Sequence, residues 1–358
     1  MRRSETKRLN GESGRIARTV EKMKILVTGS AGFIGYHLCE LLLKEGHEVF
    51  GVDAFTPYYN VQLKQDRHTR LNRLNGFNSE KLHLEDAEAL TRIFSSFAPD
   101  VVIHLAAQAG VRYSIDNPEV YVSSNLVGTC NLLEQVKKNE IQHFLFASTS
   151  SVYGSSTEMP FEEADPSNSP MSFYAATKKA GEVMSHSYAH LFDIPTTCFR
   201  FFTVYGPWGR PDMALFKFTR AILDSVPIDV FNHGEMHRDF TYVDDLVQAI
   251  LRLVTVPPGL EDSKIKNDSK SQSAPWRVVN IGNSKSESLL RFIEVLEDEL
   301  GEKAKKNFLP LQAGDVPKTW ADCSLLTELT GFKPSTPIET GIRNFVHWYR
   351  QYYENLDR

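Results

Sequence analysis

The feature that most limits how this chain can fold is the stretch KILVTGSAGFIG at residues 24–35. Its first half is a short apolar run of the kind that forms a buried parallel strand. Its second half spaces Gly29, Gly32 and Gly35 so as to allow a tight turn, close approach of the backbone to a pyrophosphate, and close helix–strand packing. Apolar residues at helical spacing follow, so we expect the N–H groups of a new helix to face an anion. The stretch therefore predicts a strand, a phosphate-binding turn and a helix.

A carboxylate at the end of the next predicted strand indicates which ligand the turn binds. Asp53 ends the predicted strand at 48–53 and stands 18 residues after Gly35. A carboxylate at this place accepts hydrogen bonds from both ribose hydroxyls of an adenosine and repels a 2′-phosphate. A glycine cluster alone often marks only a turn, but the strand, the helix and Asp53 together favour NAD as the cofactor.

The composition is that of an ordinary globular protein, with 41% apolar and 24% charged residues in a chain of 358. That length allows one large domain or two modest ones. The net charge of −5 argues against a nucleic-acid partner, and no apolar run is long enough to span a membrane. The cysteines are scattered and the histidines show no paired spacing, so we expect no disulfide framework, no metal site and a reducing, cytoplasmic location.

Two polar segments fall outside the regular pattern. Residues 1–22 carry an excess of arginine and lysine over glutamate and lack the apolar core of a secretory signal. We expect a disordered leader there in preference to a basic arm for an acidic partner. Residues 257–275 are rich in serine, lysine and aspartate, and we expect them to form a mobile surface loop.

Strands and helices alternate along residues 24–202, which predicts right-handed crossovers and a parallel sheet of the Rossmann type. After the first two strands we expect strands at 82–84, 100–107, 143–147 and 196–202, with helices at 61–74, about 90–97, 117–138 and 171–191. Beyond residue 206 the alternation loosens, with helices near 213–225, 243–254, 286–300 and 337–353. These patterns predict an α/β fold with a doubly wound NAD-binding domain at 23–200, a smaller carboxyl-terminal α/β substrate lobe at 201–358, and a cleft between them.

Three side chains capable of acid–base chemistry are predicted to face that cleft. Tyr174 and Lys178 lie four residues apart, so they share one face of the helix predicted at 171–191. A tyrosine titrates near pH 10, and an ammonium beside it, with the positive ring of an oxidised nicotinamide, would lower its pKa by about 3 units. Thr149 follows the strand predicted at 143–147 and would add a hydroxyl. Each feature alone is also compatible with a chance pair or a serine-rich turn, but together they indicate catalysis.

These features together resemble the extended short-chain dehydrogenase/reductase superfamily, in its branch of nucleotide-sugar epimerases and dehydratases, over residues 23–350. The resemblance rests on the glycine turn, Asp53, HLAAQ at 104–108, the Thr149 stretch, the Tyr174/Lys178 pair and RDFTYVDD at 238–245. Within the branch, QAGVRYS at 108–114 and RFFTVYGPWGRPDMA at 200–214 resemble the UDP-glucuronate 4-epimerases. The resemblance implies an NAD-dependent isomerase that acts on a UDP-sugar and works as a homodimer.

The resemblance also implies roles for residues by position. Tyr174 would be the base, Thr149 would relay the proton, and Lys178 would hold the ribose of NAD and lower the pKa of the tyrosine. The rest of the NAD site would consist of Gly29, Ala31, Gly32, Phe33, Ile34, Gly35, Asp53, Asp86, Ala106, Ala107, Gln108 and Asn125.

For the substrate, the resemblance implies that Arg238 and Asp315 hold the UDP portion. Two departures stand out: Thr203 replaces the asparagine of galactose epimerases, and Gln312 replaces a frequent arginine. The 4-keto form of a uronic acid is a β-keto acid that loses carbon dioxide readily, so a pure epimerase must grip the carboxylate. Hydroxyls and a guanidinium suit that task, and the candidates are Thr203, Ser150 and Arg210, with Arg112 second.

The reaction is narrowed further by groups that the chain lacks. Related dehydratases carry an Asp-Glu pair, and related decarboxylases a glutamate, just after the catalytic threonine, where this chain has Ser150 and Ser151. The leading interpretation is interconversion of UDP-glucuronate and UDP-galacturonate through a 4-keto intermediate. A decarboxylating epimerase that gives a UDP-pentose, a UDP-N-acetylglucosamine 4-epimerase and, more remotely, a non-catalytic NAD-binding regulatory protein remain open.

Overall fold

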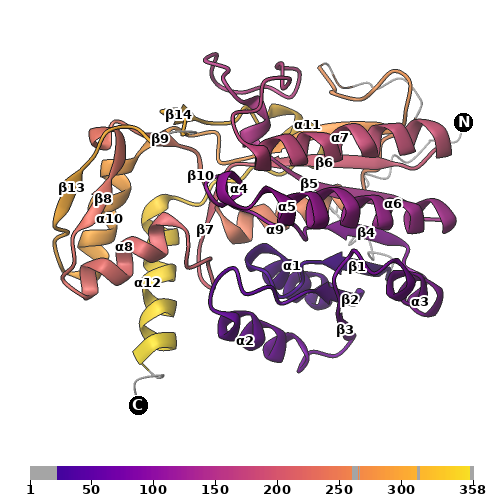
Figure 1. The fold of residues 1–358 in the computed structure, drawn as a ribbon, viewed down its shortest axis with the longest axis horizontal. Helices are drawn as coiled ribbons and strands as arrows, with labels where there is room; N and C mark the ends of the chain where they lie inside the picture. Colours follow the sequence, from indigo (N-terminus) through magenta and orange to yellow (C-terminus); the bar gives the residue numbers. More distant parts are fainter. Residues whose placement is uncertain (1–21, 260–264, 266, 313–314, 355–358) are drawn as a thin grey trace, which may run out of the picture.

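The computed structural model describes residues 22–259, 265, 267–312 and 315–354, so the predicted leader lies outside the described residues apart from Lys22. A seven-stranded sheet with the order β11-β6-β5-β4-β1-β2-β3 forms its centre, and every neighbouring pair is parallel (Figure 1). The strands are β1 (Lys24–Thr28), β2 (Glu48–Asp53), β3 (Phe77–Lys81), β4 (Val101–His104), β5 (His143–Thr149), β6 (Thr196–Phe201) and β11 (Trp276–Ile281).

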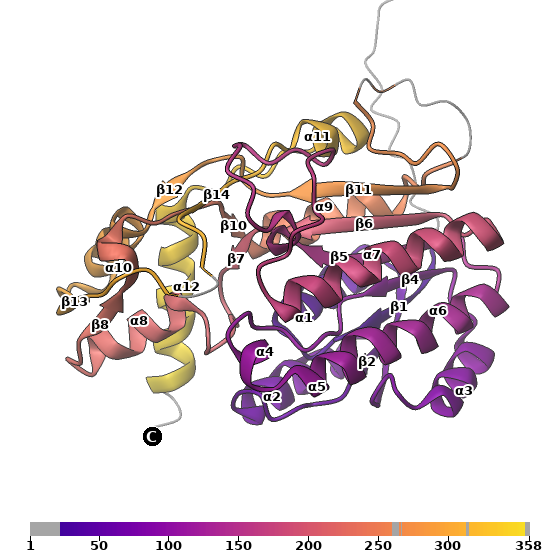
Figure 2. The ribbon, with the colours of Figure 1, turned by 45° about the horizontal axis from the view of Figure 1, so that its top comes forward.

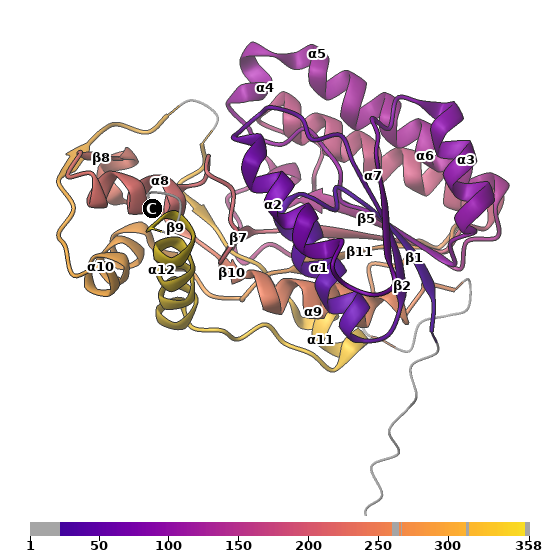
Figure 3. The same cartoon turned by 90° about the horizontal axis from the view of Figure 1, so that it is seen from below.

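Helices cover both faces of the sheet (Figures 2 and 3). One face carries α3 (Ala87–Phe97), α6 (Gly128–Lys138) and α7 (Phe173–Phe192), which pack side by side. The other face carries α1 (Phe33–Lys44) and α9 (Val243–Val254), with α2 (Val61–Leu71) beside α1 and α11 (Ser324–Thr330) beside α9. Burial on both faces explains why the central strands read as apolar runs. In the described part of the chain, no helix is both long and apolar enough to cross a membrane.

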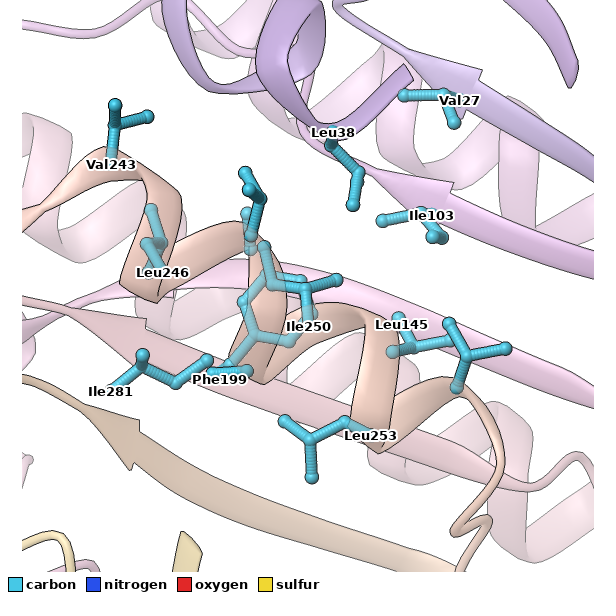
Figure 4. Close-up of a cluster of buried hydrophobic side chains, with 14 of the residues drawn as sticks. Val27, Leu38, Ile103, Leu145, Phe199, Val243, Leu246, Ile250, Leu253 and Ile281 are labelled. Atoms are coloured by element: carbon cyan, nitrogen blue, oxygen red, sulfur yellow. The ribbon is translucent and has the colours of Figure 1, made fainter. Parts of the chain in front are cut away.

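The core on the α1 and α9 face joins the two halves of the sequence (Figure 4). Val27, Ile103 and Leu145 from neighbouring strands lie against Leu38 of α1 and Ile250 of α9, and all five are 0% exposed. Burying a side chain of this size contributes roughly 1.5–3 kcal/mol. Because α9 and β11 both come from beyond residue 240, the sheet and its cover draw on the region predicted as the substrate lobe as well as on residues 23–200.

A smaller part of the molecule stands beside the carboxyl ends of the strands (Figure 1). Its helices α8 (Ala214–Leu223), α10 (Leu289–Leu300) and α12 (Ile338–Glu354) share a second core. Short strand pairs complete it: β7 (Thr203–Tyr205) with β10 (Phe240–Tyr242), β8 (Ile228–Val230) with β13 (Lys306–Phe308), and β9 (His237–Arg238) with β12 (Glu287–Ser288) and β14 (Lys318–Thr319). The four helices predicted beyond residue 206 are confirmed as α8, α9, α10 and α12.

Two predicted elements are wrong in detail. The strand expected at 82–84 lies earlier, as β3, because an edge strand tolerates the polar sequence NSEK, whereas Leu82 and Leu84 are buried just beyond its end. The continuous helix expected at 117–138 is divided into α5 (Pro118–Tyr121), a π-helical turn (Val122–Val127) and α6, after a short α4 (Tyr113–Asp116). A π-helical turn is rare and occurs frequently at functional sites.

The loop expected at 257–275 is anchored at one end. Residues 260–264 and 266 lie outside the described residues. Asp268, in contrast, forms an ion pair with Arg277 of β11 at 3.1 Å, and the two side chains are only 3% and 7% exposed. The end of the loop next to β11 is therefore held on the sheet, and the expectation of a mobile loop does not apply there.

Candidate active site

A pocket opens at the carboxyl ends of β1, β2, β4 and β5, where the strand order reverses between β1 and β4. In open parallel sheets this reversal is the usual place for a ligand. The pocket brings together most of the predicted cofactor residues and the predicted catalytic pair: Gly29, Gly32, Phe33, Ile34, Gly35, Asp53, Ala106, Ala107, Gln108, Tyr174 and Lys178, together with Arg210.

The glycine turn has the conformation that its sequence predicts. Gly29 has a φ of +75°, and an added Cβ would lie 2.9 Å from the backbone nitrogen of Ala106. Gly32 is the N-cap of α1 and makes no side-chain cap, so its missing side chain leaves the first N–H groups of the helix open to the pocket. The positive end of the helix dipole lies there too, and the turn therefore fits a pyrophosphate.

Asp53 supports the glycine turn as well as facing the pocket. One carboxylate oxygen accepts the backbone N–H of Ala31 at 3.1 Å, and the other accepts that of Phe55 at 2.8 Å. Ala31 itself is 0% exposed and lies behind the turn. Each carboxylate oxygen keeps a lone pair for a further donor, so Asp53 can still accept ribose hydroxyls.

Two predicted cofactor residues lie elsewhere. Asp86 is the N-cap of α3 and accepts the N–H of Ala89 at 2.9 Å, while the preceding residues, His83 to Glu85, line the pocket. Asn125 is a buried residue of the π-helical turn. Its side-chain oxygen accepts the N–H of Gln108 at 2.8 Å, and its amide nitrogen donates to the Gln108 carbonyl and to the Thr177 hydroxyl, both at 3.0 Å. Asn125 thus holds the backbone of Gln108, a residue of the pocket lining that follows β4. Neither Asp86 nor Asn125 is among the described residues that line the pocket.

The segment between β2 and α2, together with the first turn of α2, contributes pocket residues that were not predicted. Thr56, Tyr58, Tyr59 and Lys64 all line the pocket. The Lys64 ammonium, only 6% exposed, donates to the carbonyl and hydroxyl of Thr56 at 3.0 and 3.1 Å. The sequence signal that could have found them is the aromatic cluster FTPYY at 55–59, which begins two residues after Asp53.

Tyr174 and Lys178 stand on the first two turns of α7, which Ser172 caps by accepting the N–H of Ala175 at 3.1 Å. Burial raises the pKa of Tyr174, whereas the charge of Arg210 and a hydrogen bond from Thr149 lower it. Burial also lowers the pKa of Lys178 to about 7, and its ammonium donates to the Ala147 carbonyl at 2.9 Å. The charge of Arg210 therefore lowers the pKa of the phenol in this structure, and the predicted action of Lys178 on the tyrosine stays a prediction.

The end of β5 beside the tyrosine is held rigidly. The hydroxyl oxygens of Thr149 and Ser151 lie 3.2 Å apart. Next to it, Ser148 donates at 2.6 Å to Glu182, which also binds Arg200 in two bonds of 2.9 and 3.0 Å. Breaking such a buried pair by removing one partner typically costs about 3–5 kcal/mol. This network, which was not predicted, ties α7, the helix of Tyr174 and Lys178, to β5 and β6 through Glu182.

Arg210 reaches the pocket from the loop after β7. Its Nε and Nη2 bind the two carboxylate oxygens of Asp212 at 3.0 and 2.5 Å, and Tyr58 donates to the same carboxylate at 3.2 Å. The guanidinium is 23% exposed. Ser150 opens a short 3₁₀ turn and Thr203 begins β7, and neither belongs to the described lining of this pocket.

Arg112, Arg238 and Asp315 form a second polar group. Arg112 makes an ion pair with Asp315 at 3.1 Å, and the charge of Asp315 also acts on Arg238, whose pKa is lowered by burial. Arg238 donates to the Pro317 carbonyl at 3.0 Å. Arg112 therefore lies with the two residues that were predicted to hold UDP, and its place as second candidate for the carboxylate stays a prediction.

A family model described as the NAD dependent epimerase/dehydratase family matches residues 25–267. The chain belongs to this family. The predicted resemblance and the predicted α/β fold class are both confirmed, and the glycine turn, the pocket and the Tyr174/Lys178 pair occupy the matched region.

Relatives within the epimerase family match almost the whole chain. A probable UDP-glucuronate 4-epimerase of Rhizobium meliloti (strain 1021) is 54% identical over 335 residues, covering 92% of this chain and 98% of that protein. UDP-glucuronate 4-epimerase 4 of Arabidopsis thaliana is 44% identical over 352 residues, covering 97% and 80%. The crystal structure of UDP-glucuronic acid 4-epimerase from Bacillus cereus, in complex with UDP-glucuronic acid and NAD, is 35% identical with a TM-score of 0.82, covering 92% of this chain and all of that one.

Proposed function

We propose that this protein is a UDP-glucuronate 4-epimerase that interconverts UDP-glucuronate and UDP-galacturonate with bound NAD. The observation that carries the proposal is that Tyr174, Lys178 and the guanidinium of Arg210 meet in one pocket with the glycine turn. The pocket combines acid–base groups with a fixed cation suited to a sugar carboxylate. The relatives described above support the same reaction and the same cofactor.

The residues present fit NAD. Gly29 and Gly32 form a cradle that side chains would fill, the first turn of α1 offers N–H groups to a pyrophosphate, and the Asp53 carboxylate would repel a 2′-phosphate. Lys178 would hold the nicotinamide ribose. When bound, NAD supplies reversible hydride transfer at carbon 4 of the sugar.

The chain's own residues control the proton of the 4-hydroxyl. Tyr174 accepts that proton, directly or through the hydroxyl of Thr149, and returns it to the inverted alcohol. Arg210 and Thr149 favour the phenolate that this step requires. The Ser148–Glu182–Arg200 network keeps the end of β5 in place beside the tyrosine while the sugar turns.

The two polar groups would bind opposite ends of the substrate. Arg210 would hold the carboxylate, with Thr203 and Ser150 as hydroxyl donors, and Arg238 with Asp315 would hold the UDP portion. A gripped carboxylate cannot align its carbon–carbon bond with the 4-ketone, so the grip opposes loss of carbon dioxide. Arg210 thus favours a pure epimerase over the decarboxylating one, and a neutral sugar such as N-acetylglucosamine would leave this cation without a partner.

We also propose a homodimer that forms through α7 and the α5–α6 region. Four large apolar side chains on these neighbouring elements are exposed by 41–63%: Val122, Val127, Val183 and Leu191. Large apolar side chains exposed on neighbouring helices suit a protein–protein contact. The four cysteines are all unpaired, which suits the reducing cytoplasm that we propose as its location.

Incubation of the purified protein with UDP-glucuronate tests the proposal. Products are separated by chromatography and weighed, and Tyr174→Phe serves as the inactive control. An isomer of unchanged mass supports the 4-epimerase. Loss of 44 Da, the mass of carbon dioxide, would identify the decarboxylating enzyme, and turnover of UDP-N-acetylglucosamine alone would assign the neutral-sugar reaction.

A further inference from the structure

Arg67 of α2 makes contacts that the roles described so far do not explain. Its side chain is 0% exposed. Nη1 donates to the carbonyl of Ala31 at 3.1 Å and to the hydroxyl of Tyr59 at 2.9 Å. Nη2 donates to the carbonyls of Trp208 at 2.5 Å and Gly209 at 3.2 Å. A single guanidinium therefore joins the glycine turn, the segment over the pocket, and the loop that leads to the pocket arginine.

The acceptors around Arg67 are unusual for a buried cation. Among the described residues its acceptors are three carbonyls and one hydroxyl, with no carboxylate, and its Nε has no acceptor. Burying an arginine without a counter-charge costs free energy that backbone carbonyls only partly offset. A purely apolar residue would fill this space without that cost. What the guanidinium provides is a fixed geometry between three segments that are distant in the sequence.

The loop at 206–212 needs such support. Trp208 has a φ of +57°, and a non-glycine residue in this region costs roughly 1–3 kcal/mol and persists only where its surroundings impose it. Its indole packs against Tyr36, Trp348 and Tyr352 with centroid distances of 5.1–5.6 Å. His37 adds a hydrogen bond of 2.9 Å to the Pro207 carbonyl. The loop conformation is thus determined by contacts with α1, α2 and α12.

We propose that Arg67 is a positioning residue that sets where Arg210 stands relative to the glycine turn, and thereby how the substrate carboxylate is held. Arg210 follows Trp208 and Gly209 directly in the chain, so movement of their carbonyls moves its guanidinium. The UDP group at Arg238 and the base Tyr174 lie on other elements and are not held by Arg67. This inference rests on the proposed function.

A double-mutant cycle tests the proposal, using Arg67→Met, Arg210→Ala and the combined variant. Arg73→Met, at an exposed arginine just beyond the end of α2, is the matched control. A displacement of about 1 Å at a reacting group can cost roughly a hundredfold. We therefore expect Arg67→Met to lower kcat/KM for UDP-glucuronate by about ten- to a hundredfold and to raise the UDP-pentose fraction, while the Kd for UDP changes less than about twofold.

The decisive result is the behaviour of the combined variant. If Arg67 acts through Arg210, adding Arg67→Met to Arg210→Ala changes kcat/KM and product ratio little further. Additive losses, or a Kd for UDP that weakens as much as kcat/KM, would refute the positioning role and leave a general structural one. If Arg67→Met does not fold, Arg67→Lys carries the same cycle. A wild-type protein that fails to epimerise UDP-glucuronate would instead refute the proposed function itself.

Discussion

Replacement of Arg210 by alanine is the substitution whose effect on substrate affinity can be estimated most directly from the structure. Its guanidinium has five N–H donors, of which Asp212 engages one on Nε and one on Nη2, so three remain for a ligand in the pocket. One charge-assisted hydrogen bond to a carboxylate is worth about 1.5–3 kcal/mol. Arg210→Ala should therefore lower the affinity for UDP-glucuronate by roughly 10- to 150-fold. The affinity for UDP, which lacks the carboxylate, should hardly change.

The same substitution should alter the products and the pH profile. A freed carboxylate can align with the 4-ketone, so the fraction of UDP-pentose should increase. Removal of the positive charge also raises the pKa of Tyr174, so the rise of kcat with pH should move to higher pH. Arg210→Lys separates the two effects, because it keeps the charge near the phenol but loses the planar fork.

The assay combines steady-state kinetics, calorimetry with UDP, and mass analysis of the products. Arg220→Ala is the matched control, since Arg220 pairs with Asp224 at 3.6 Å on the surface and is 75% exposed. An exposed pair of this kind contributes about 0–1 kcal/mol to stability and nothing to the pocket. Unchanged affinity, product ratio and pH profile in Arg210→Ala would refute the assignment of the carboxylate to this arginine.

Three further outcomes are expected. Tyr174→Phe should reduce turnover by at least about a hundredfold with unchanged affinity for UDP, and near-normal turnover would show that another group is the base. Lys178→Met should weaken NAD binding yet raise the melting temperature of the cofactor-free protein at pH 7. Burial lowers the pKa of this lysine to about 7, so the folded protein binds its proton less tightly than the unfolded chain does. The free-energy cost of folding that results is largest below pH 7 and vanishes above the unfolded pKa near 10.4. The gain in melting temperature of Lys178→Met should therefore disappear in alkaline thermal scans. NAD should raise the melting temperature, by the equivalent of about 2.7 kcal/mol at a hundred times its Kd, whereas NADP should not, because Asp53 repels the 2′-phosphate. Equal shifts with both cofactors would contradict this role of Asp53.

Local sequence patterns predicted the parts of the site that lie within a single turn or a single helix. The spacing of the glycines depends only on the turn, and the four-residue spacing of Tyr174 and Lys178 depends only on the helix. Asp86 also follows a local rule, because an aspartate three residues before Ala89 is a typical N-cap. Its capping bond explains its place in the fold, and its contact with the adenine stays a prediction.

Contacts between distant segments could not be predicted in this way. Arg112 and Asp315 are 203 residues apart, and nothing in either local sequence indicates their ion pair. β11 pairs with β6 in the central sheet, although the chain between these two strands forms several elements of the smaller part of the molecule. A periodic sequence pattern identifies a strand or a helix, but packing determines which distant segment lies next to it. The sequence pattern therefore could not show that Arg112 lies beside Asp315 while Arg210 lies beside Asp212.

Burial drives the two titratable members of the catalytic set toward their neutral forms. It raises the pKa of Tyr174 and lowers that of Lys178. A neutral phenol cannot accept the sugar proton, so the tyrosine needs surroundings that favour its phenolate. Among the described residues, the charge of Arg210 and the hydrogen bond from Thr149 lower its pKa. Part of the Arg210 charge is offset by Asp212 at 2.5 Å. Tyr174 is therefore held in its protonated form in the empty pocket. A cationic cofactor beside it would favour the phenolate that accepts the sugar proton, which would confine proton removal to the loaded site.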